Sequence, residues 1–197
     1  MTIVADISMS LDGFVTGPDP DLAHGLGRGG EPLHAWAIES RDEVDHEVLR
    51  EGVEATGAVV LGRRLFDIVD GPNGWDEEMG YGARHVGAQP MFVVTHHVPK
   101  TVRLTSLFTF VTHGLEAAIN QARSAANDKN VVVMGGADVV RQSVDLRLID
   151  ELQIHLAPIV LGSGTPLFEG ALPTSLIQQS VRVSRSATHL TYRLDRR

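Results

Sequence analysis

The fold of this chain is decided by residues Val131 to Phe168, which read VVVMGGADVVRQSVDLRLIDELQIHLAPIVLGSGTPLF. A run of β-branched residues leads into a Gly-Gly pair, an amphipathic pattern follows, and a second strand-like run ends the stretch. This periodicity predicts a strand, a tight turn, a helix and another strand, with Gly135 and Gly136 where the first strand gives way to the helix.

Two interpretations of the Gly-Gly pair are open. The N-terminus of a helix has unpaired N–H groups and a partial positive charge, and glycine has no Cβ to keep an anion away, so this is a place for a phosphate. Alternatively, the pair is only the tight turn that a strand-to-helix connection needs. The pair belongs to neither of the two common nucleotide-binding fingerprints, G-x-G-x-x-G and G-x-x-x-x-G-K-[ST].

The composition limits the classes of function. The chain has 197 residues, of which 43% are hydrophobic, enough for one compact domain with a sizeable core. Its formal charge of −8, from 17 Lys and Arg against 25 Asp and Glu, leaves no basic excess, so we expect no nucleic-acid partner. The absence of cysteine excludes disulfides, thiolate catalysis and cysteine-ligated zinc.

The N-terminal residues lead directly into strand-like sequence, without the basic and apolar regions of a signal peptide. No apolar run approaches the roughly 20 residues that span a bilayer. We therefore expect a cytoplasmic protein with no membrane partner. We also expect no metal site, because the nine histidines show no H-x-x-x-H spacing and the adjacent His96 and His97 would point to opposite faces of a strand.

The rest of the chain alternates between strand and helix patterns. Strands are expected over Thr2–Ser8, Ala58–Leu61, Met91–Thr95, Phe108–Thr112, Val131–Met134 and Glu151–Ala157, with a terminal antiparallel pair at roughly Ile177–Arg185 and Ala187–Leu194. Helices are expected after Gly114, after Gly136, and over roughly Asp42–Ala55, where Ser40 to Glu43 fits a capping box. This alternation predicts an α/β fold, a single three-layer domain over residues 1–197 with a central mixed, mostly parallel sheet.

A turn and a long loop follow the first strand. The Asp12-Gly13 turn in SLDGF precedes a loop, Thr16 to Pro32, that is rich in glycine, proline and aspartate and is expected either to cover a binding site or to be mobile. Asp12 is a candidate catalytic residue because it starts this loop, although aspartate in such a turn also has a purely structural role. The two tryptophans, Trp36 and Trp75, either stack on a planar ligand or pack in the core.

An arginine pair follows the second predicted strand. Arg63 and Arg64 come directly after Gly62, and a guanidinium fork is well shaped to bind a phosphate through two hydrogen bonds. A pair of arginines at the start of a surface helix is also an ordinary solvated face.

Five segments together resemble the dihydrofolate reductase-like family, and within it the branch that includes the C-terminal reductase domain of bifunctional riboflavin-synthesis enzymes. The segments span nearly the whole chain in the family's order and are SLDGF at Ser10, VVLGRR at Val59, MFVVT at Met91, VVVMGGADVV at Val131 and DELQIHLAPIVLGSGTPLF at Asp150. The resemblance implies an NADPH-dependent reductase of a planar heterocycle such as a pterin or pyrimidine, with the cofactor across the strand ends. It also implies a homodimer.

The resemblance assigns cofactor contacts residue by residue. It implies a 2′-phosphate site at Arg63 and Arg64, and contacts to the adenosine from Thr95 and His96. It implies a pyrophosphate site at the Gly-Gly pair and the following helix start. The full set of implied cofactor-binding residues is Gly62, Arg63, Arg64, Thr95, His96, Gly135, Gly136, Ala137, Asp138 and Val139.

The sequence departs from the family in three places. The region of the first helix shows no segment that matches the family's substrate-binding carboxylate, which leaves Asp12 as the candidate acid. Leu65 stands where dihydrofolate reductases usually carry threonine. The deaminase domain of the bifunctional enzymes needs cysteines that this chain lacks. The missing carboxylate keeps a second hypothesis open, a non-catalytic nucleotide-binding module that retains the NADPH cleft.

Overall fold

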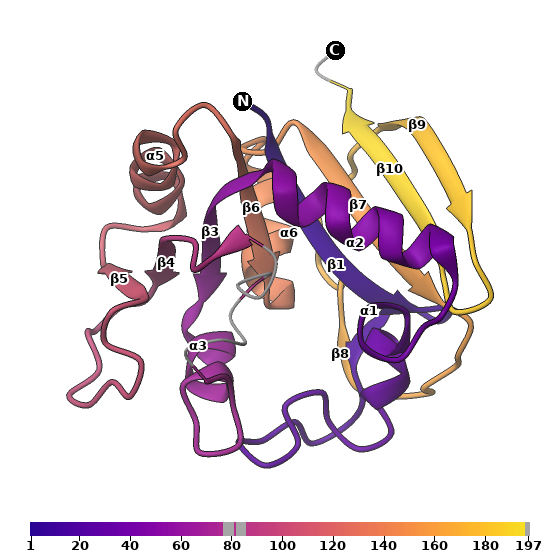
Figure 1. The fold of residues 1–197 in the computed structure, drawn as a ribbon, viewed down its shortest axis with the longest axis horizontal. Coiled ribbons are helices and arrows are strands. Elements are labelled where there is room, and N and C mark those ends of the chain that lie inside the picture. Colours follow the sequence, from indigo (N-terminus) through magenta and orange to yellow (C-terminus); the bar gives the residue numbers. More distant parts are fainter. Residues whose placement is uncertain (77–80, 82–85, 196–197) are drawn as a thin grey trace.

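The computed structural model describes residues 1–76, 81 and 86–195. It contains an eight-stranded sheet with the strand order β5-β4-β3-β6-β1-β7-β10-β9, and a separate two-stranded sheet of β2 and β8 (Figure 1). The six strands from β5 to β7 in this order are parallel to one another. β10 is antiparallel to both of its neighbours, β7 and β9. The predicted mixed, mostly parallel sheet with a C-terminal antiparallel pair is confirmed.

The elements follow the predicted order along the chain. The strands are β1 Ile3–Ser10, β2 Phe14–Thr16, β3 Thr56–Gly62, β4 Met91–Val94, β5 Phe108–Val111, β6 Asn130–Gly135, β7 Glu151–Ala157, β8 Thr165–Pro166, β9 Leu176–Val183 and β10 Thr188–Leu194. The helical elements are η1 Glu31–His34, α1 Ala35–Ile38, α2 Glu43–Ala55, α3 Arg63–Val69, α5 Leu115–Ala125 and α6 Ala137–Asp145. Among the described residues, no helix combines the length and apolar character that crossing a bilayer requires.

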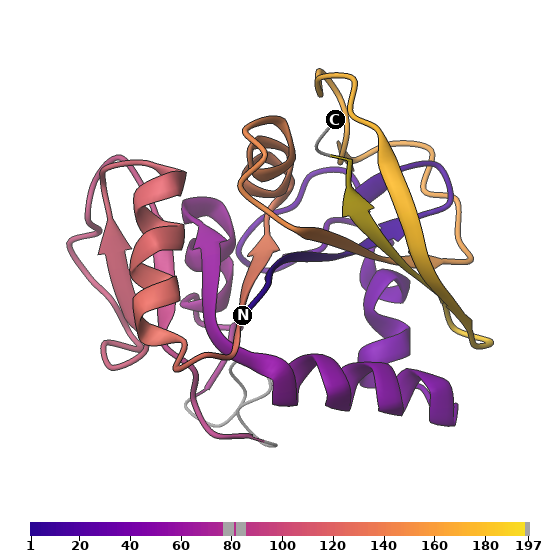
Figure 2. The ribbon, with the colours of Figure 1, turned by 90° about the horizontal axis from the view of Figure 1, so that it is seen from above.

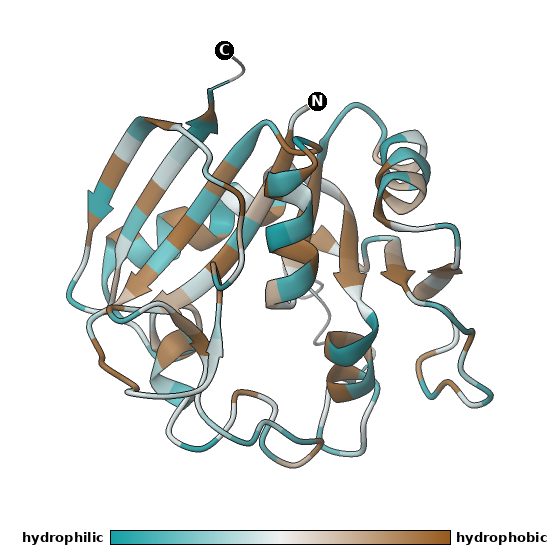
Figure 3. Cartoon of the chain, turned by 180° about the vertical axis from the view of Figure 1, so that it is seen from behind, coloured by the Kyte–Doolittle hydropathy of each residue, from teal (hydrophilic) through white to brown (hydrophobic). Residues whose placement is uncertain are grey.

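Helices cover both faces of the sheet, which gives the three predicted layers. On one face, α5 and α6 pack on a core that includes Ala58, Val60 and Val133. On the other face, α3 packs on Val59 and Leu61. The view from above shows α2 and α6 on opposite sides of the strands (Figure 2). Because both faces are covered, β3 is buried along its whole length. Hydrophobic residues dominate these central strands, whereas the helices in front carry hydrophilic residues as well (Figure 3).

The predicted capping box at the start of α2 is wrong. Asp42 is the N-cap, and its Oδ1 accepts a hydrogen bond of 3.1 Å from the Val44 N–H. The Ser40 hydroxyl instead donates to the buried carboxylate of Asp45, so it lies outside the helix. Asp42 therefore takes the capping position, and the helix begins at Glu43, within one residue of the predicted start.

The loop after β2 folds back on itself. The Gly17 N–H donates to the Leu26 carbonyl at 2.7 Å, and the Arg28 N–H donates to the Pro18 carbonyl at 2.9 Å. At Gly25, an added Cβ would lie 2.6 Å from Cγ2 of Ile68, so glycine lets the loop approach α3 closely. These contacts place the loop beside the carboxyl end of β1, where it lines a cavity.

Candidate active site

A cavity of about 650 Å³ lies at the carboxyl ends of the parallel strands, and we call it the strand-end cavity. This is the edge at which open α/β sheets bind their ligands. The structure brings nearly all of the predicted cofactor residues together here, and Gly135 ends β6 directly behind it. The predicted residues that line it are Gly62, Arg63, Arg64, Thr95, His96, Gly136, Ala137, Asp138 and Val139.

The two glycines beside α6 have different roles. Gly136 is the N-cap of α6, and an added Cβ there would meet no atom within 4 Å, so its backbone faces open space. Gly135 has a φ of +127°, which favours glycine, and its peptide bond to Gly136 is cis. At Gly62, an added Cβ would lie 2.7 Å from Cγ2 of Val139. Gly62 therefore serves the close packing of α6 on β3.

The arginine pair forms one rim of the strand-end cavity. The Nε of Arg63 donates to Asp67 at 2.8 Å and its Nη1 donates to the His97 carbonyl at 3.0 Å, while the side chain stays 39% exposed. The Arg64 guanidinium reaches the carbonyl of Pro20 at 3.4 Å. These contacts hold two positive charges at the cavity without neutralising both of them.

Two other predicted residues have partners of their own. The Thr95 hydroxyl donates to the His97 carbonyl at 2.9 Å, which shapes the turn after β4. Asp138 lies in the first turn of α6, where its carboxylate accepts a hydrogen bond of 2.6 Å from Arg141. This ion pair offsets a negative charge at a helix end that would otherwise repel a phosphate.

Two further cavities continue from the strand-end cavity towards β1. A junction cavity of about 130 Å³ shares Arg64, Leu65 and Gly136 with it. An aromatic cavity of about 390 Å³ follows and shares Ser8 and Leu65 with the junction cavity. Leu65 thus lines all three. The aromatic cavity is lined by Trp36, Trp75 and Tyr81 together with the polar residues Asp6, Ser8 and His34.

Trp36 packs in the core and also lines a cavity. Its side chain is buried, its ring stacks on His155 with a centroid distance of 4.0 Å, and its Nε1–H donates to the Ser8 hydroxyl at 2.9 Å. The same residue forms part of the wall of the aromatic cavity.

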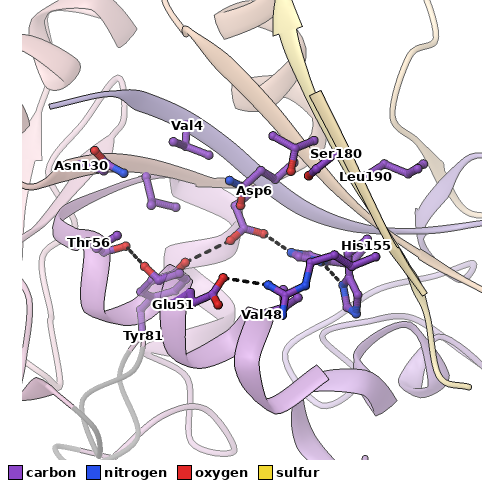
Figure 4. Close-up of a pocket in the computed structure, with 17 residues that line it drawn as sticks. Val4, Asp6, Val48, Glu51, Thr56, Tyr81, Asn130, His155, Ser180 and Leu190 are labelled. Carbon is purple, nitrogen blue, oxygen red and sulfur yellow. Dashed lines mark hydrogen bonds and ion pairs between the residues drawn. The ribbon is translucent and has the colours of Figure 1, made fainter. Parts of the chain in front are cut away.

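A chain of buried polar groups lies beneath the aromatic cavity. Asp6 Oδ1 contacts Nε2 of His155 at 2.9 Å, and the Nδ1 atoms of His155 and His189 are 2.7 Å apart. Nε2 of His189 contacts Asp45 Oδ1 at 2.7 Å. The Tyr81 hydroxyl donates to the other oxygen of Asp6 at 3.1 Å (Figure 4).

Burial and charge set the ionisation of this chain. Burial raises the pKa of Asp6, but the charge of His155 and hydrogen bonds from His155 and Tyr81 outweigh it, so the pKa is lowered. Burial likewise raises the pKa of Asp45, and hydrogen bonds from two serines and His189 produce a net lowering. The pKa of His189 is lowered, chiefly by burial. Both carboxyl groups are therefore ionised near neutral pH.

Sequence reasoning missed Asp6 and His155 as site residues, although a local signal was present. Asp6, Ser8 and Ser10 alternate along β1, which places polar side chains on one face of a strand. His155 lies on the polar side of the predicted alternation in β7, and it pairs in register with Ser8. The links to β10 and α2 have no local signal, because His189 and Asp45 are distant in the sequence.

Asp12 has contacts that account for a structural role. Its carboxylate accepts hydrogen bonds from the Ser10 hydroxyl at 2.6 Å and from the N–H groups of Leu161 and Gly162 at 3.1 and 2.7 Å. The hydrogen bond from Ser10, supported by those backbone donors, lowers the pKa of Asp12 to about 2 despite some desolvation. Asp12 thus joins the turn after β1 to the loop after β7 and lines none of the three connected cavities. Its catalytic role stays a prediction.

Comparisons with known proteins agree with this architecture. The chain is 22% identical over 172 residues to the uncharacterised protein YyaP of Bacillus subtilis. The aligned region covers 84% of this chain and 79% of that protein. A protein of Shewanella sp. PV-4 assigned to riboflavin biosynthesis has a solved structure with a TM-score of 0.70 at 22% identity, over 100% of both chains.

Two further solved structures have the same fold. A pyrimidine reductase-like protein of Corynebacterium diphtheriae has a TM-score of 0.62 at 17% identity, over 100% of this chain and 93% of that one. The diaminohydroxyphosphoribosylaminopyrimidine deaminase/5-amino-6-(5-phosphoribosylamino)uracil reductase of Thermotoga maritima has a TM-score of 0.61 at 15% identity, over 98% of this chain and 56% of that one. The family model described as the RibD C-terminal domain matches residues 1–190. The chain therefore belongs to the RibD C-terminal domain family, a family of riboflavin-pathway reductases.

Proposed function

We propose that this protein is an NADPH-dependent reductase that transfers a hydride to a planar heterocycle of the pterin or pyrimidine kind. The observation that carries this proposal is the row of three connected cavities, which joins a cationic strand-end site to an aromatic site with a carboxylate. The dinucleotide and the heterocycle would then meet near Leu65.

The strand-end cavity fits a phosphorylated dinucleotide. The start of α6 at Gly136 would hold the pyrophosphate, since its backbone faces open space and carries the partial positive charge of a helix N-terminus. Arg63 and Arg64 would bind the 2′-phosphate, and Thr95 and His96 would lie beside the adenosine. When bound, NADPH supplies the hydride.

The aromatic cavity fits a planar ring. Trp36, Trp75 and Tyr81 provide flat apolar surfaces, and Asp6 and His34 provide the polar groups that would orient ring N–H and C=O groups. The structural relatives from Corynebacterium and Thermotoga carry pyrimidine or uracil reductase in their descriptions, which supports the same substrate class here.

The burial of Asp45 is the observation that favours the non-catalytic alternative. Asp45 of α2, the helix region in which no match to the family's substrate-binding carboxylate was found, is fully buried and contacts His189. A module that binds the nucleotide without catalysing a reaction would not need a carboxylate in the substrate cavity. Asp6 supplies one from β1 instead, and for this reason we favour the reductase.

The test is titration with NADPH, followed by rapid mixing of the complex with dihydropterin and pyrimidine acceptors while the reduced nicotinamide absorbance is monitored. We expect binding and oxidation with at least one acceptor. Tight binding without oxidation of any acceptor would favour the non-catalytic module, and a lack of NADPH binding would refute both functions. The homodimer stays a prediction that sedimentation of the purified protein tests.

A further inference from the structure

The buried polar chain has more hydrogen-bond contacts than two neutral histidines have ring hydrogens. Three contacts link Asp6, His155, His189 and Asp45 in that order, at 2.9, 2.7 and 2.7 Å. Each contact needs one hydrogen between its two atoms, because carboxylate oxygens and unprotonated ring nitrogens are only acceptors. Two neutral imidazoles bring one ring hydrogen each. A third, exchangeable proton is therefore needed to satisfy the whole chain.

The third proton can move along the chain without breaking any contact. With the proton on either imidazole or on either carboxylate, every contact still has one hydrogen. Burial lowers the pKa of His189, which favours its neutral form, and Asp6 Oδ1 lies 2.9 Å from Nε2 of His155, so we assign the third proton to the Asp6 end of the chain. The resting proton thus lies one hydrogen bond away from the aromatic cavity.

Charged groups from the surrounding elements enclose this chain. His34, from η1, has a pKa lowered by burial and then by the charge of His155, so it stays neutral and does not compete for the proton. Burial and the Asp6 carboxylate raise the pKa of Tyr81 well above its ordinary value, which keeps its hydroxyl protonated.

On the other side of the chain, Arg182 of β9 faces His189 and forms ion pairs with Glu47 and Glu51 of α2, at 2.6 and 2.7 Å. The side chains of Asp6, His155 and Arg182 line a histidine cavity of about 210 Å³, drawn in Figure 4. A polar cavity of this size has room for solvent that can exchange protons with the two imidazoles.

Given the proposed reductase activity, we propose that Asp6 delivers this stored proton to the substrate and that His155, His189 and Asp45 hold and replace it. Asp6 is the group at the substrate because it lines the aromatic cavity, with its side chain 18% exposed. The other three are positioning residues that act through Asp6, and Asp45 is fully buried at the far end.

The step balances for a substrate with a C=N bond. The carbon gains the hydride that the reduced nicotinamide supplies, and the π electron pair moves to the nitrogen. The stored proton passes along the hydrogen bond from His155 to the Asp6 carboxylate, and the O–H bond formed there breaks as the substrate nitrogen forms its N–H bond. His155 and Asp6 share the replacement proton, and solvent in the histidine cavity refills the imidazole pair. The new nitrogen base is far stronger than a carboxylate, so the proton moves towards it.

Nitrogen-15 NMR of labelled histidine in the cofactor-free protein tests the stored proton. At pH 7 we expect one ring of the His155 and His189 pair to carry protons on both nitrogens and the other ring to carry one. His189→Gln assigns the signals, and His46→Gln, an exposed position on α2, is the matched control. Two neutral rings at pH 7 would overturn the proposal whether or not the protein reduces anything.

The delivery step is tested with Asp6→Asn and Asp45→Asn. Hydride transfer to a dihydropterin, measured in a single turnover, should slow by about 100-fold or more in Asp6→Asn. In Asp45→Asn we expect about a 10-fold loss at pH 8 and a smaller loss at pH 6, because solvent protons replace the stored one. An equal loss at both pH values would show a merely structural role and overturn the relay.

These experiments separate the relay from the proposed function. NADPH affinity should stay within about two-fold in both variants, because neither residue lines the strand-end cavity. The unmodified protein failing to bind NADPH would refute the proposed function, and with it the delivery of a proton to a reduced substrate.

Discussion

Replacing Gly136 with alanine tests the strand-end cavity as the cofactor site while leaving the fold in place. An added Cβ at Gly136 meets no atom within 4 Å, and the φ of −69° is one that alanine adopts readily. In the free protein the methyl group therefore points into open space. With NADPH bound, it would occupy the place where the pyrophosphate approaches the start of α6.

We expect Gly136→Ala to weaken NADPH binding without lowering stability. Loss of one hydrogen bond to a charged phosphate oxygen costs about 1.5–3 kcal/mol, which raises Kd by about 10- to 150-fold. The free energy of unfolding should stay unchanged or rise by about 0.4–1 kcal/mol, because alanine restricts the unfolded chain. Calorimetric titration with NADPH measures the first quantity and urea denaturation measures the second.

Gly62→Ala is the matched control, because the same methyl group meets a neighbour there. Its Cβ would lie 2.7 Å from Cγ2 of Val139, so either the Val139 side chain or α6 must shift. Overpacking of this kind costs about 1–3 kcal/mol of stability. If Gly136→Ala binds NADPH as tightly as the unmodified protein does, the pyrophosphate does not lie at Gly136 and the reasoning is refuted.

Three other predictions concern charge. Arg63→Ala should raise the Kd of NADPH by about 10-fold or more, from the loss of a charge-assisted hydrogen bond, with little change for NADH; equal losses would show that Arg63 does not bind the 2′-phosphate. The lowered pKa values of Asp6 and Asp45 give stability that is present above the ordinary carboxyl pKa and lost as the pH falls through their folded values, and His189 adds a loss that begins below its ordinary pKa of 6.5. The melting temperature should therefore begin to fall below pH 6.5, as the His189 contribution is lost, and fall further below pH 3.8, as the two carboxyl contributions are lost; a flat profile down to about pH 3 would contradict these shifts. Asp12→Asn should lower the melting temperature, since its carboxylate joins two loops; a loss of single-turnover rate at unchanged stability would restore its catalytic role.

Local periodicity predicted most of the fold. The stretch from Val131 to Phe168 gave β6, α6 and β7 in the right order, and the predicted range of β7 matches the structure residue for residue. β3 is longer than predicted at both ends because its flanking residues, Thr56 and Gly62, are buried against neighbouring strands and helices. The start of α2 was predicted to within one residue, but its cap was assigned wrongly because Ser40 contacts Asp45 and Asp42 caps the helix.

The candidate site was only half accessible to sequence reasoning. The phosphate end is local, since a helix N-terminus and the arginines after a strand are visible as short motifs. The aromatic cavity is not, because it depends on how the loop after β2 packs on α3. The buried chain takes one residue each from β1, β7, β10 and α2, and no spacing in the sequence reports which of these side chains meet.

The central claim is that the protein is a reductase that binds the 2′-phosphate of NADPH. Titrating the unmodified protein with NADPH and with NADH under the same salt conditions tests it most directly. Two guanidinium groups at the rim of the strand-end cavity predict at least a 10-fold lower Kd for NADPH, from about 1.4 kcal/mol or more of phosphate binding, and a difference that shrinks as salt is raised. Equal affinities for the two dinucleotides, or no binding of either, would contradict the account.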